Sequence, residues 1–458
     1  MNSNLTTGFV ATEMRQRGYA VVEGPERAIS GGAADSRKVV PGDLFTAFPG
    51  ENTDGNAYVE AALAAGAAAV ICTRPPVGHW PEATVVVAPD ATRAVGELAH
   101  AWRKECDPKV VGITGTVGKT TAKEFTAGLL EQRFRTHKSV GNFNSREGLP
   151  LALMSLRREH EVSVLEIGMD SKGEIAELAA IAEPEVGAVL NIGLTHVSKL
   201  GSIEAITEEK LSLVRALPRT GTALLNADDE RVFGVAAQLS CQVITFGESE
   251  DAILRRGSVT DRGLGGTSFD VSFGGITERV NSPLPGMHTI PAVLTAMAAG
   301  LALGMNLRGA ASAAEQADVA GRARVLKLES GAILIDDRYN SSPASLTGAL
   351  RMLGGLGGRR IAFLGRMAEL GEFEEDEHRK AGTVAAANCD ILVCSGPTCL
   401  ALADAARAAG LADVRWFATK EEAAAELEEL LQPGDTVLVK ASRGEAFETV
   451  IAGMEEAR

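Results

Sequence analysis

The stretch GITGTVGKTTAKEF, residues 112–125, constrains the fold most strongly, because it places a glycine-rich turn between a strand and a helix. An apolar run from Val110 to Ile113 precedes the turn, and the residues from Lys119 onward repeat apolar positions at helical spacing. The spacing departs from the usual phosphate-binding pattern, G-x-x-x-x-G-K-[ST], because Ile113 replaces its first glycine. The stretch therefore indicates an α/β protein that has either a phosphate-binding loop or an ordinary strand-to-helix turn at this place.

The residues that bind a phosphate in such a loop are still present despite this change of spacing. Gly115 and Gly118 allow left-handed backbone torsions and the close approach of an anion, and Lys119 supplies an ammonium group. The turn opens a helix, whose N-terminal N–H groups favour negative charge. The hydroxyl of Thr120 stands where it can reach a magnesium ion. We therefore expect a nucleotide to be bound by Gly115, Thr116, Gly118, Lys119, Thr120 and Thr121.

The length and charge of the chain limit its number of domains and its kinds of partner. At 458 residues it is too long for one hydrophobic core, so we expect roughly two to four domains. The formal net charge of −15 argues against nucleic acid as a partner, since binding to a phosphate backbone needs clustered Lys and Arg. No apolar run reaches the roughly 18 residues of a membrane span, and the N-terminal residues lack the order of a signal peptide. These features predict a cytoplasmic protein without a membrane span, and we expect it to be a monomer.

The alternation of strand-like and helical segments divides the chain into three parts. Residues 1–105 combine turn-rich segments with an alanine-rich helix, which is typical of a small α/β module. Residues 106–318 alternate strands and helices and predict a parallel sheet that is covered on both faces. Residues 319–458 alternate again and predict a Rossmann-like, doubly wound domain. Sheets of this kind bind ligands at the carboxyl ends of their strands.

Three polar residues stand at or near the ends of the central strands. Glu166 follows "SVL", His196 closes "VLNIGLTH" and Lys210 lies on the next predicted helix. Because the carboxyl ends of parallel strands meet in one crevice, these side chains could converge on phosphates beside Lys119. Each residue alone also has an ordinary structural explanation, as a helix cap, a core histidine or part of a solvated helix face.

This order of loop, glutamate, histidine and lysine resembles that of the Mur ligases, the ATP-dependent enzymes that add amino acids to the peptidoglycan precursor. The resemblance covers almost the whole chain, in "DSRKVVPGDLF", "TGTVGKTTAKE", "LEIGMDSKGEI", "NIGLTHVSKLGSIEAITEEK", "LPGMH", "IDDRYNSSPASL", "LGRMAELG" and "VKASRG". Within the family, "GNFN" with "GLPL", the "GEI" element and "YN" followed by "P" favour the members that join D-alanyl-D-alanine to UDP-N-acetylmuramoyl-tripeptide.

The resemblance implies roles for individual residues. Lys119 and Thr120 would hold the outer phosphates of ATP, and Thr120, Glu166 and His196 would ligate magnesium. Lys210 would carry a carbamate, which turns a cation into an anion that can bind the metal and requires a lysine able to lose its proton. The other implied contacts are Arg322 with the γ-phosphate, Asp337 and Asn340 with the nucleotide, Ser36 and Arg37 with the uridine diphosphate, and Asn142, Lys440, Ser442 and Arg443 with the substrates.

The resemblance also implies a reaction and a separate role for each of the three domains. ATP would phosphorylate the terminal carboxylate of the tripeptide, and the amine of the dipeptide would attack the acyl phosphate, which gives an amide, ADP and phosphate. Residues 1–105 would bind the UDP-linked muramoyl peptide, 106–318 the ATP, and 319–458 would complete the ligase site. Closure of the three domains would keep water away from the reactive intermediate.

Several positions depart from the residues that are usual in the family: Asp170, Ser171, Thr289, Ala292, Arg338, Ser342 and Arg366. The residues expected at the phosphates and magnesium are present, whereas these departures fall at positions that face the base or the substrates. Two alternatives therefore stay open: a family member with a different carboxylate or amine, and a nucleotide-hydrolysing switch protein. Lys210 and Arg322 favour a ligase, because a switch needs neither a carbamate lysine nor an arginine from another domain.

Overall fold

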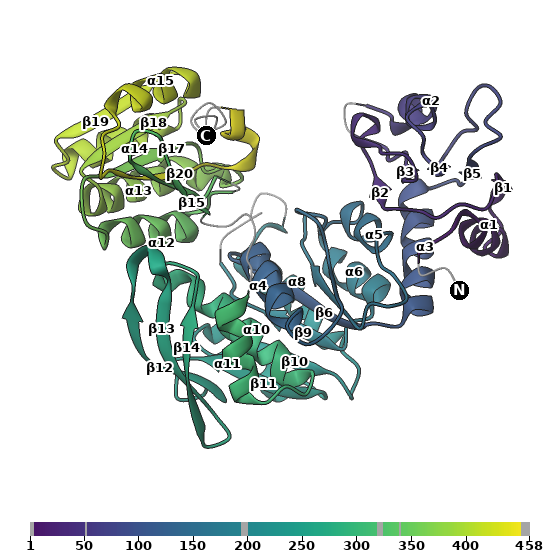
Figure 1. The fold of residues 1–458 in the computed structure, drawn as a ribbon, viewed down its shortest axis with the longest axis horizontal. Helices are drawn as coiled ribbons and strands as arrows, with labels where there is room; N and C mark the ends of the chain where they lie inside the picture. Colours follow the sequence, from purple (N-terminus) through teal and green to yellow (C-terminus); the bar gives the residue numbers. More distant parts are fainter. Residues whose placement is uncertain (1–3, 51–52, 194–199, 318–323, 339, 450–458) are drawn as a thin grey trace.

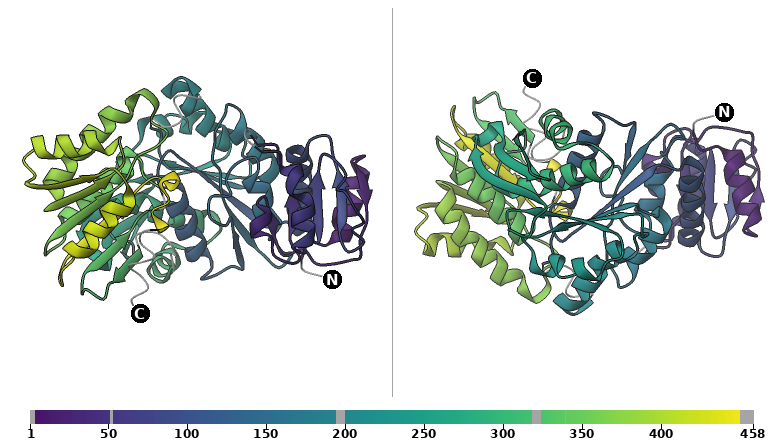
Figure 2. Two further views of the ribbon diagram at one scale, coloured as in Figure 1. Left: turned by 90° about the horizontal axis from the view of Figure 1, so that it is seen from above. Right: turned by 90° about the horizontal axis from the view of Figure 1, so that it is seen from below.

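The computed structural model describes residues 4–50, 53–193, 200–317, 324–338 and 340–449. Three β-sheets divide the described chain into three α/β domains, which follow one another along the sequence (Figure 1). The N-terminal and C-terminal domains lie at opposite ends of the molecule, with the central domain between them (Figure 2). This architecture confirms the predicted fold class.

The N-terminal sheet has five strands in the order β1-β5-β4-β3-β2. It is parallel except at β1, which pairs antiparallel with β5. Its strands are β1 (Ala20–Val22), β2 (Gly32–Ala33), β3 (Leu44–Thr46), β4 (Ala69–Cys72) and β5 (Thr84–Val87), and its helices are α1 (Thr7–Gln16), α2 (Val59–Ala64) and α3 (Ala91–Cys106). Helix α3 buries residues at helical spacing, among them Ala94, Leu98 and Trp102, and so packs along one face.

The central sheet has nine strands in the order β14-β13-β12-β11-β10-β9-β6-β8-β7. The strands are β6 (Lys109–Thr114), β7 (Thr136–Lys138), β8 (Val162–Glu166), β9 (Val186–Val189), β10 (Thr222–Asn226), β11 (Gln242–Gly247), β12 (Leu254–Asp261), β13 (Thr267–Phe273) and β14 (Ile276–Ser282). Strands β6 to β12 pair in parallel, and β12, β13 and β14 form an antiparallel extension at one edge. Strand β6 lies where the strand order changes direction, which is the place where open α/β sheets bind ligands.

The helices of the central domain include α4 (Lys119–Leu130), α5 (Gly148–Leu153), α6 (Glu174–Ala182), α8 (Ile203–Arg215), α9 (Glu230–Phe233), α10 (Ile290–Ala302) and α11 (Leu307–Gln316). Strand β6 is a continuous apolar run, and its Val110, Val111 and Ile113 have no exposed surface. Such runs are typical of a parallel strand covered by helices on both faces. Helix α4 packs against α10, so the helix that follows the glycine loop is covered by the domain's own core.

The C-terminal sheet has six strands in the order β15-β16-β20-β17-β18-β19. Its strands are β15 (Arg324–Lys327), β16 (Ile333–Asp336), β17 (Arg360–Leu364), β18 (Ile391–Ser395), β19 (Asp413–Phe417) and β20 (Thr436–Lys440), and its helices are α12 (Pro343–Gly354), α13 (Glu374–Asn388), α14 (Cys399–Ala408) and α15 (Lys420–Leu430). All neighbouring strands pair in parallel except β15 and β16. The loops after β16, β17 and β20 therefore meet at one edge of this sheet.

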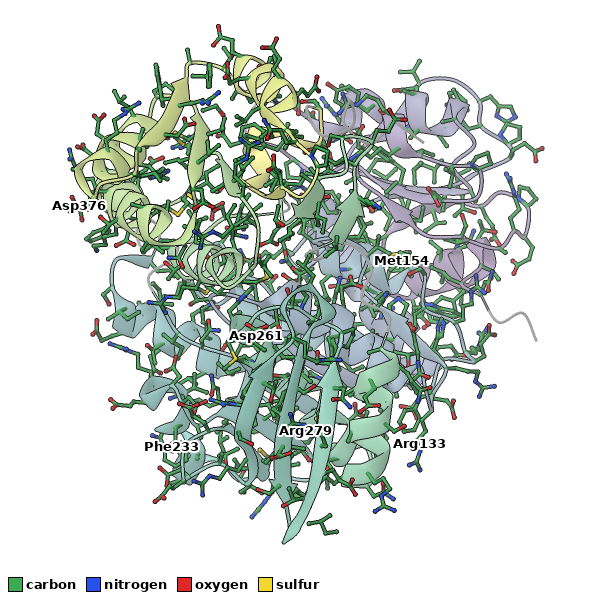
Figure 3. All side chains as sticks on the ribbon, turned by 60° about the vertical axis from the view of Figure 1, so that its left-hand side comes forward. Arg133, Met154, Phe233, Asp261, Arg279 and Asp376 are labelled. Atoms are coloured by element: carbon green, nitrogen blue, oxygen red, sulfur yellow. The ribbon has the colours of Figure 1, made fainter. Side chains whose placement is uncertain are left out.

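Helix α3 joins the N-terminal domain firmly to the central domain. The indole Nε1 of Trp102 donates to the Leu156 carbonyl at 2.9 Å, and the buried guanidinium of Arg103 donates to the Ala182 and Glu183 carbonyls. One continuous apolar cluster runs from Leu5 in the N-terminal domain into the central domain. Met154, which is labelled in Figure 3, belongs to this cluster. The N-terminal domain therefore has a defined position relative to the central sheet.

His137 on β7 is a buried histidine of the central core. Its Nδ1 lies 2.9 Å from the Ser163 hydroxyl, and its Nε2 lies 3.2 Å from the Ala152 carbonyl and 3.1 Å from the Ser155 hydroxyl. Burial, helped by the nearby His160, lowers the pKa of His137 to about 3. The imidazole is therefore neutral in the folded protein at every pH where the protein is expected to work.

We expect this histidine to make the central domain less stable in mild acid. Between about pH 6.5 and pH 3 an unfolded histidine binds a proton and the folded His137 does not, so stability rises with pH in this window. The free energy of unfolding should fall by at most about 1.4 kcal/mol for each pH unit below 6.5 from this group alone. Urea unfolding of wild type and His137→Gln at pH 7 and pH 5 measures the difference. An equal loss in both proteins would show that His137 does not contribute.

Candidate active site

The glycine loop between β6 and α4 has the backbone geometry of an anion site. Gly118 has φ of +84° and caps α4, and a side chain at Gly115 would lie 2.9 Å from the Cβ of Leu190. The side-chain oxygen of Asn191 accepts from the backbone N–H groups of Thr116 at 3.1 Å and Val117 at 2.8 Å. Asn191 therefore holds the loop in shape.

Two lysines point at the same atom of this loop. The Nζ of Lys119 donates to the Gly115 carbonyl at 2.9 Å and to the Thr116 carbonyl at 3.3 Å, and the Nζ of Lys210 donates to the Gly115 carbonyl at 2.9 Å. Lys210 is only 2% exposed. Burial and the charge of Lys119 lower the pKa of Lys210 well below that of an ordinary lysine, against the opposing effect of Glu209. The Lys119 ammonium and the N–H groups of the loop would stabilise an anion here, so the loop fits a phosphate.

A hydroxyl and a carboxylate meet beside these lysines. The Oγ1 of Thr120 donates to Glu166 Oε2 at 2.7 Å, and the Nδ2 of Asn144 donates to Glu166 Oε1 at 2.7 Å. Glu166 closes β8 and is only 2% exposed. Among the described residues no group of three or more His, Cys, Asp or Glu gathers to hold a metal. One carboxylate with a hydroxyl still fits magnesium, which takes oxygen ligands and commonly shares them with phosphates and water.

Two of the predicted site residues of "VKASRG", Lys440 and Ser442, form hydrogen bonds within the C-terminal domain. The Nζ of Lys440 donates to Asp337 Oδ2 at 2.6 Å and to the Asn340 carbonyl at 2.9 Å, and the lysine is 2% exposed. The buried Ser442 hydroxyl donates to the Ser341 carbonyl at 3.2 Å and accepts from the Ala368 N–H at 2.9 Å. Lys440 and Ser442 thus hold the loops that follow β16 and β17.

Arg443, the residue after Ser442, forms a contact between the C-terminal and central domains. The guanidinium of Arg443 donates to the side-chain oxygen of Asn142 in the central domain. A second contact joins the 3₁₀ turn Met287–Thr289 of the central domain to α12, where the backbone of Gly348 lies against His288. The loops at the edge of the C-terminal sheet therefore face the loop that carries Asn142.

The remaining predicted residues lie farther from the lysine pair or outside the described chain. Ser36 and Arg37 belong to a short 3₁₀ turn of the N-terminal domain, where Asp35 receives two hydrogen bonds from the exposed Arg37 side chain. Thr121 is in the first turn of α4. His196 and Arg322 lie outside the described residues, so their predicted roles stay predictions.

The residues that depart from the family's pattern have structural partners of their own. Thr289 donates to the Gly286 carbonyl at 2.7 Å, and Ala292 is buried on α10. Ser342 caps α12 through Ser345. The other departing side chains pair locally: Arg338 with Asp336, Arg366 with Glu374, and Ser171 with Arg146, while the Asp170 N–H donates to Glu174. None of these contacts has Lys119, Lys210, Thr120 or Glu166 as a partner.

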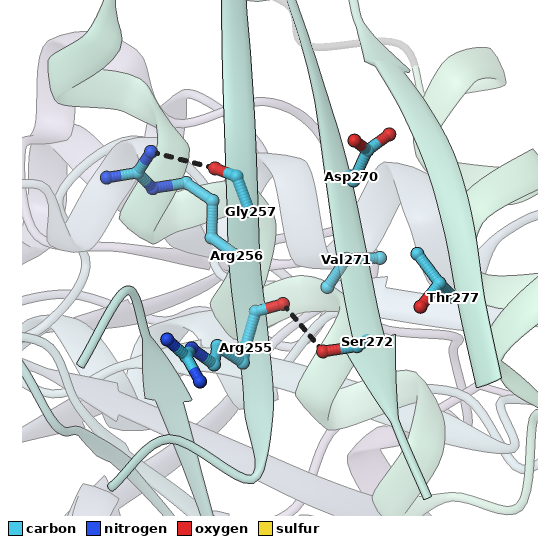
Figure 4. A pocket seen from close by; sticks show the side chains of 7 residues that line it. All are labelled: Arg255, Arg256, Gly257, Asp270, Val271, Ser272 and Thr277. Atoms are coloured by element: carbon cyan, nitrogen blue, oxygen red, sulfur yellow. Dashed lines mark hydrogen bonds between the residues drawn. The ribbon is translucent and has the colours of Figure 1, made fainter. Parts of the chain in front are cut away.

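A separate cavity of about 280 Å³ lies on the antiparallel extension, away from β6. Its lining residues come from the neighbouring strands β12, β13 and β14 (Figure 4): Arg255, Arg256, Gly257, Asp270, Val271, Ser272 and Thr277. Arg255 and Arg256 already pair with Glu250 and Glu248. The cavity is therefore not part of the lysine site.

The fold and the loop define a nucleotide-binding α/β protein of three domains. Residues 113–300 match the Mur ligase middle domain, residues 321–443 match the Mur ligase glutamate ligase domain, and residues 28–103 match the Mur ligase catalytic domain. The chain belongs to the Mur ligase family, as its motifs predict.

Individual relatives cover nearly all of the chain. A UDP-N-acetylmuramoyl-tripeptide–D-alanyl-D-alanine ligase from Bacillus subtilis is 34% identical over 94% of each chain, and the one from Escherichia coli is 32% identical over 95% of this chain and 96% of its own. Among solved structures, MurF from Acinetobacter baumannii aligns over 99% of both chains with a TM-score of 0.87 and 28% identity. The MurF ligase from Thermotoga maritima in complex with ADP aligns over 93% of this chain and 97% of its own, with a TM-score of 0.78 and 26% identity.

Proposed function

We propose that this protein is an ATP-dependent ligase that joins D-alanyl-D-alanine to UDP-N-acetylmuramoyl-tripeptide in peptidoglycan synthesis. The observation that carries the ligase chemistry is the lysine pair, Lys119 and Lys210, on the Gly115 carbonyl. A simple nucleotide switch needs only the first of these lysines, whereas a buried amine with a lowered pKa can react with carbon dioxide to give a carbamate and a proton. The substrates are proposed from the names of the relatives.

The loop and its neighbours would bind ATP and magnesium. The backbone of Gly115 to Gly118 with Lys119 would hold the phosphates, while Thr120, Glu166, His196 and the carbamate of Lys210 would hold the metal. When bound, magnesium neutralises charge on the phosphoryl group that is transferred. Asp337 and Asn340 would contact the nucleotide from the C-terminal domain, and Arg322 would reach its γ-phosphate.

The reaction would proceed by displacement at phosphorus and then at carbon. A carboxylate oxygen of the tripeptide attacks the γ-phosphorus, and the bond to the β-phosphate oxygen breaks to release ADP. The dipeptide amine then attacks the acyl carbon, loses a proton and expels phosphate. Lys119 and Arg322 would stabilise the negative charge that develops on the transferring group.

The outer parts of the site would bind the two substrates. Ser36 and Arg37 would hold the uridine diphosphate on the N-terminal domain, whose position is set by α3. Asn142 and Arg443 would meet the dipeptide at the contact between domains, while Lys440 and Ser442 support the neighbouring loops from within the C-terminal domain. We also propose that the protein acts in the cytoplasm as a monomer. None of the described helices is long and apolar enough to cross a membrane.

The proposal is tested by following phosphate release and product mass together. UDP-linked tripeptide, D-alanyl-D-alanine and Mg-ATP are supplied together and with each substrate omitted, and parallel reactions contain other dipeptides. We expect phosphate release to require both substrates and to match the amount of UDP-linked pentapeptide found by mass spectrometry. Phosphate release that ignores the dipeptide would favour a switch, and a product formed only with another dipeptide would favour a different ligase.

A further inference from the structure

Lys123 is a buried lysine that the proposed chemistry does not use. It lies on α4, one helical turn after Lys119, and has no exposed surface. Its Nζ donates to the Ser139 carbonyl at 2.7 Å and to the Gly141 carbonyl at 3.2 Å, and lies 2.6 Å from Glu124 Oε1. These contacts use all the N–H donors of an ammonium group. A buried charge that is bonded so completely fixes the groups around it, since each of them would lose a partner if it moved.

The two carbonyls belong to residues 139–144, here called the 139–144 loop, which holds Glu166 at two points. The hydroxyl of Ser139 accepts from the Glu166 N–H at 3.3 Å, and the Nδ2 of Asn144 donates to Glu166 Oε1 at 2.7 Å. The carbonyl of Asn144 also accepts from the Gly168 N–H at 2.7 Å. The loop therefore determines where the Glu166 carboxylate points.

The contacts close a ring that begins and ends on α4. Lys123 holds the 139–144 loop, the loop holds Glu166, and Glu166 accepts from Thr120, which lies on the same helix as Lys123. We propose that Lys123 is a positioning residue, which fixes the Glu166 carboxylate at the right distance from the Thr120 hydroxyl for the two to share a magnesium ion. This inference rests on the proposed function, because it concerns the metal that would accompany ATP.

A neighbouring lysine provides a matched control. Lys138 on β7 lies 2.8 Å from Glu124 Oε2, so it shares the carboxylate partner of Lys123. Burial alone would raise the pKa of Glu124, but hydrogen bonds from Lys123 and Lys138 outweigh it and hold this pKa below its usual value. Removing either lysine therefore weakens the same ion pair, whereas the carbonyls of the 139–144 loop are bonded to Lys123.

The test compares ATP binding to the full chain with and without magnesium, by calorimetry. We expect Lys123→Met to reduce the strengthening of ATP binding by magnesium by about 10- to 100-fold, the usual effect of removing a group that orients a metal ligand. The magnesium-free Kd should stay within about twofold of wild type, since the glycine loop is intact. Lys138→Met should match wild type in both measurements, and kcat should fall in Lys123→Met with little change in the KM of the dipeptide.

Three results would overturn the inference: unchanged magnesium strengthening in Lys123→Met, an equal loss in Lys138→Met, or an equal loss of magnesium-free affinity. If Lys123→Met does not fold, Lys123→Gln replaces it with the same expected loss of magnesium strengthening, because its amide keeps two of the three N–H donors but not the charge. A cycle with Asn144→Ala adds a check, since effects carried through one chain of contacts should not be additive. Additive effects would contradict the ring. A wild type that binds Mg-ATP but joins no substrates would overturn the proposed function and leave this measurement valid.

Discussion

Lys210→Ala should lower the rate of ligation by about a thousandfold, the upper range for the loss of one positioned electrostatic group in an active site. The lysine is buried, bonded to the Gly115 carbonyl and next to Lys119, so its replacement would leave the magnesium site without the anionic ligand that a carbamate would supply. Acetate or formate should restore part of the activity, because a small carboxylate can enter the space left by the side chain. Initial rates of product formation, with and without these acids, measure both effects.

Glu208→Ala is the control for this experiment. Glu208 lies on the same helix, α8, and its carboxylate pairs with Arg215 at the surface. It should behave as wild type, with or without acetate. Activity of Lys210→Ala close to that of wild type would remove Lys210 from the site. Rescue that is as strong in Glu208→Ala would show that the acids act elsewhere.

Lys119→Met is expected to have the second large effect, with kcat lower by about a hundredfold to a thousandfold. The methionine keeps most of the side-chain volume but removes the ammonium that lies on the glycine loop. The charge of Lys119 also lowers the pKa of Lys210, so the variant should hold its Lys210 proton more tightly. We therefore expect less carbamate on Lys210, in addition to weaker binding of ATP.

Rate measurements and carbon-13 NMR separate these two consequences. Wild type in labelled bicarbonate should show a carbamate signal that disappears in Lys210→Ala and is weaker in Lys119→Met at the same pH. The signal of Lys119→Met should recover as the pH rises, because more of the Lys210 amine becomes neutral. A signal in Lys119→Met that equals wild type throughout would show that the two lysines are not coupled.

The local part of the site could be predicted from the sequence. The glycines, Lys119 and Thr120 are contiguous, and the strand and helix on either side follow from their apolar spacing. The alternation of strands and helices likewise predicts three α/β domains, because each segment carries its own periodicity. The rule that carboxyl ends of parallel strands meet at one edge places Glu166 near the glycine loop. Lys210 lies within a helix, so its place beside Lys119 depended on the family resemblance as well.

The supporting contacts could not be predicted in this way. Asn191 bonds to the backbone of Thr116, and Asn144 bonds to Glu166, yet nothing in the local sequence distinguishes these asparagines from others. Both asparagines lie in segments, "NIG" and "GNFN", that match the family's motifs. That match is the sequence feature that points to these two residues. Lys123 looks like an ordinary lysine of an exposed helix face until the fold places the 139–144 loop over it.

The direction in which side chains point could not be predicted from the sequence either. The family resemblance implies that Lys440 and Ser442 contact the substrates, and the structure shows them bonded to Asp337 and Ser341 inside the C-terminal domain. Residues along a strand alternate between its two faces, but a motif at the strand end does not tell which neighbours lie above it. A role for these two residues in supporting the loops is what the contacts favour, and their approach to the dipeptide stays a proposal.

The most direct test of the central claim follows one oxygen atom. If the tripeptide carboxylate attacks the γ-phosphorus of ATP, an oxygen of that carboxylate leaves with the phosphate when the dipeptide amine displaces it. Tripeptide labelled with oxygen-18 in its terminal carboxylate should therefore give phosphate that carries one labelled oxygen for each amide formed, as measured by mass spectrometry. Unlabelled phosphate, released while amide is formed, would contradict the account.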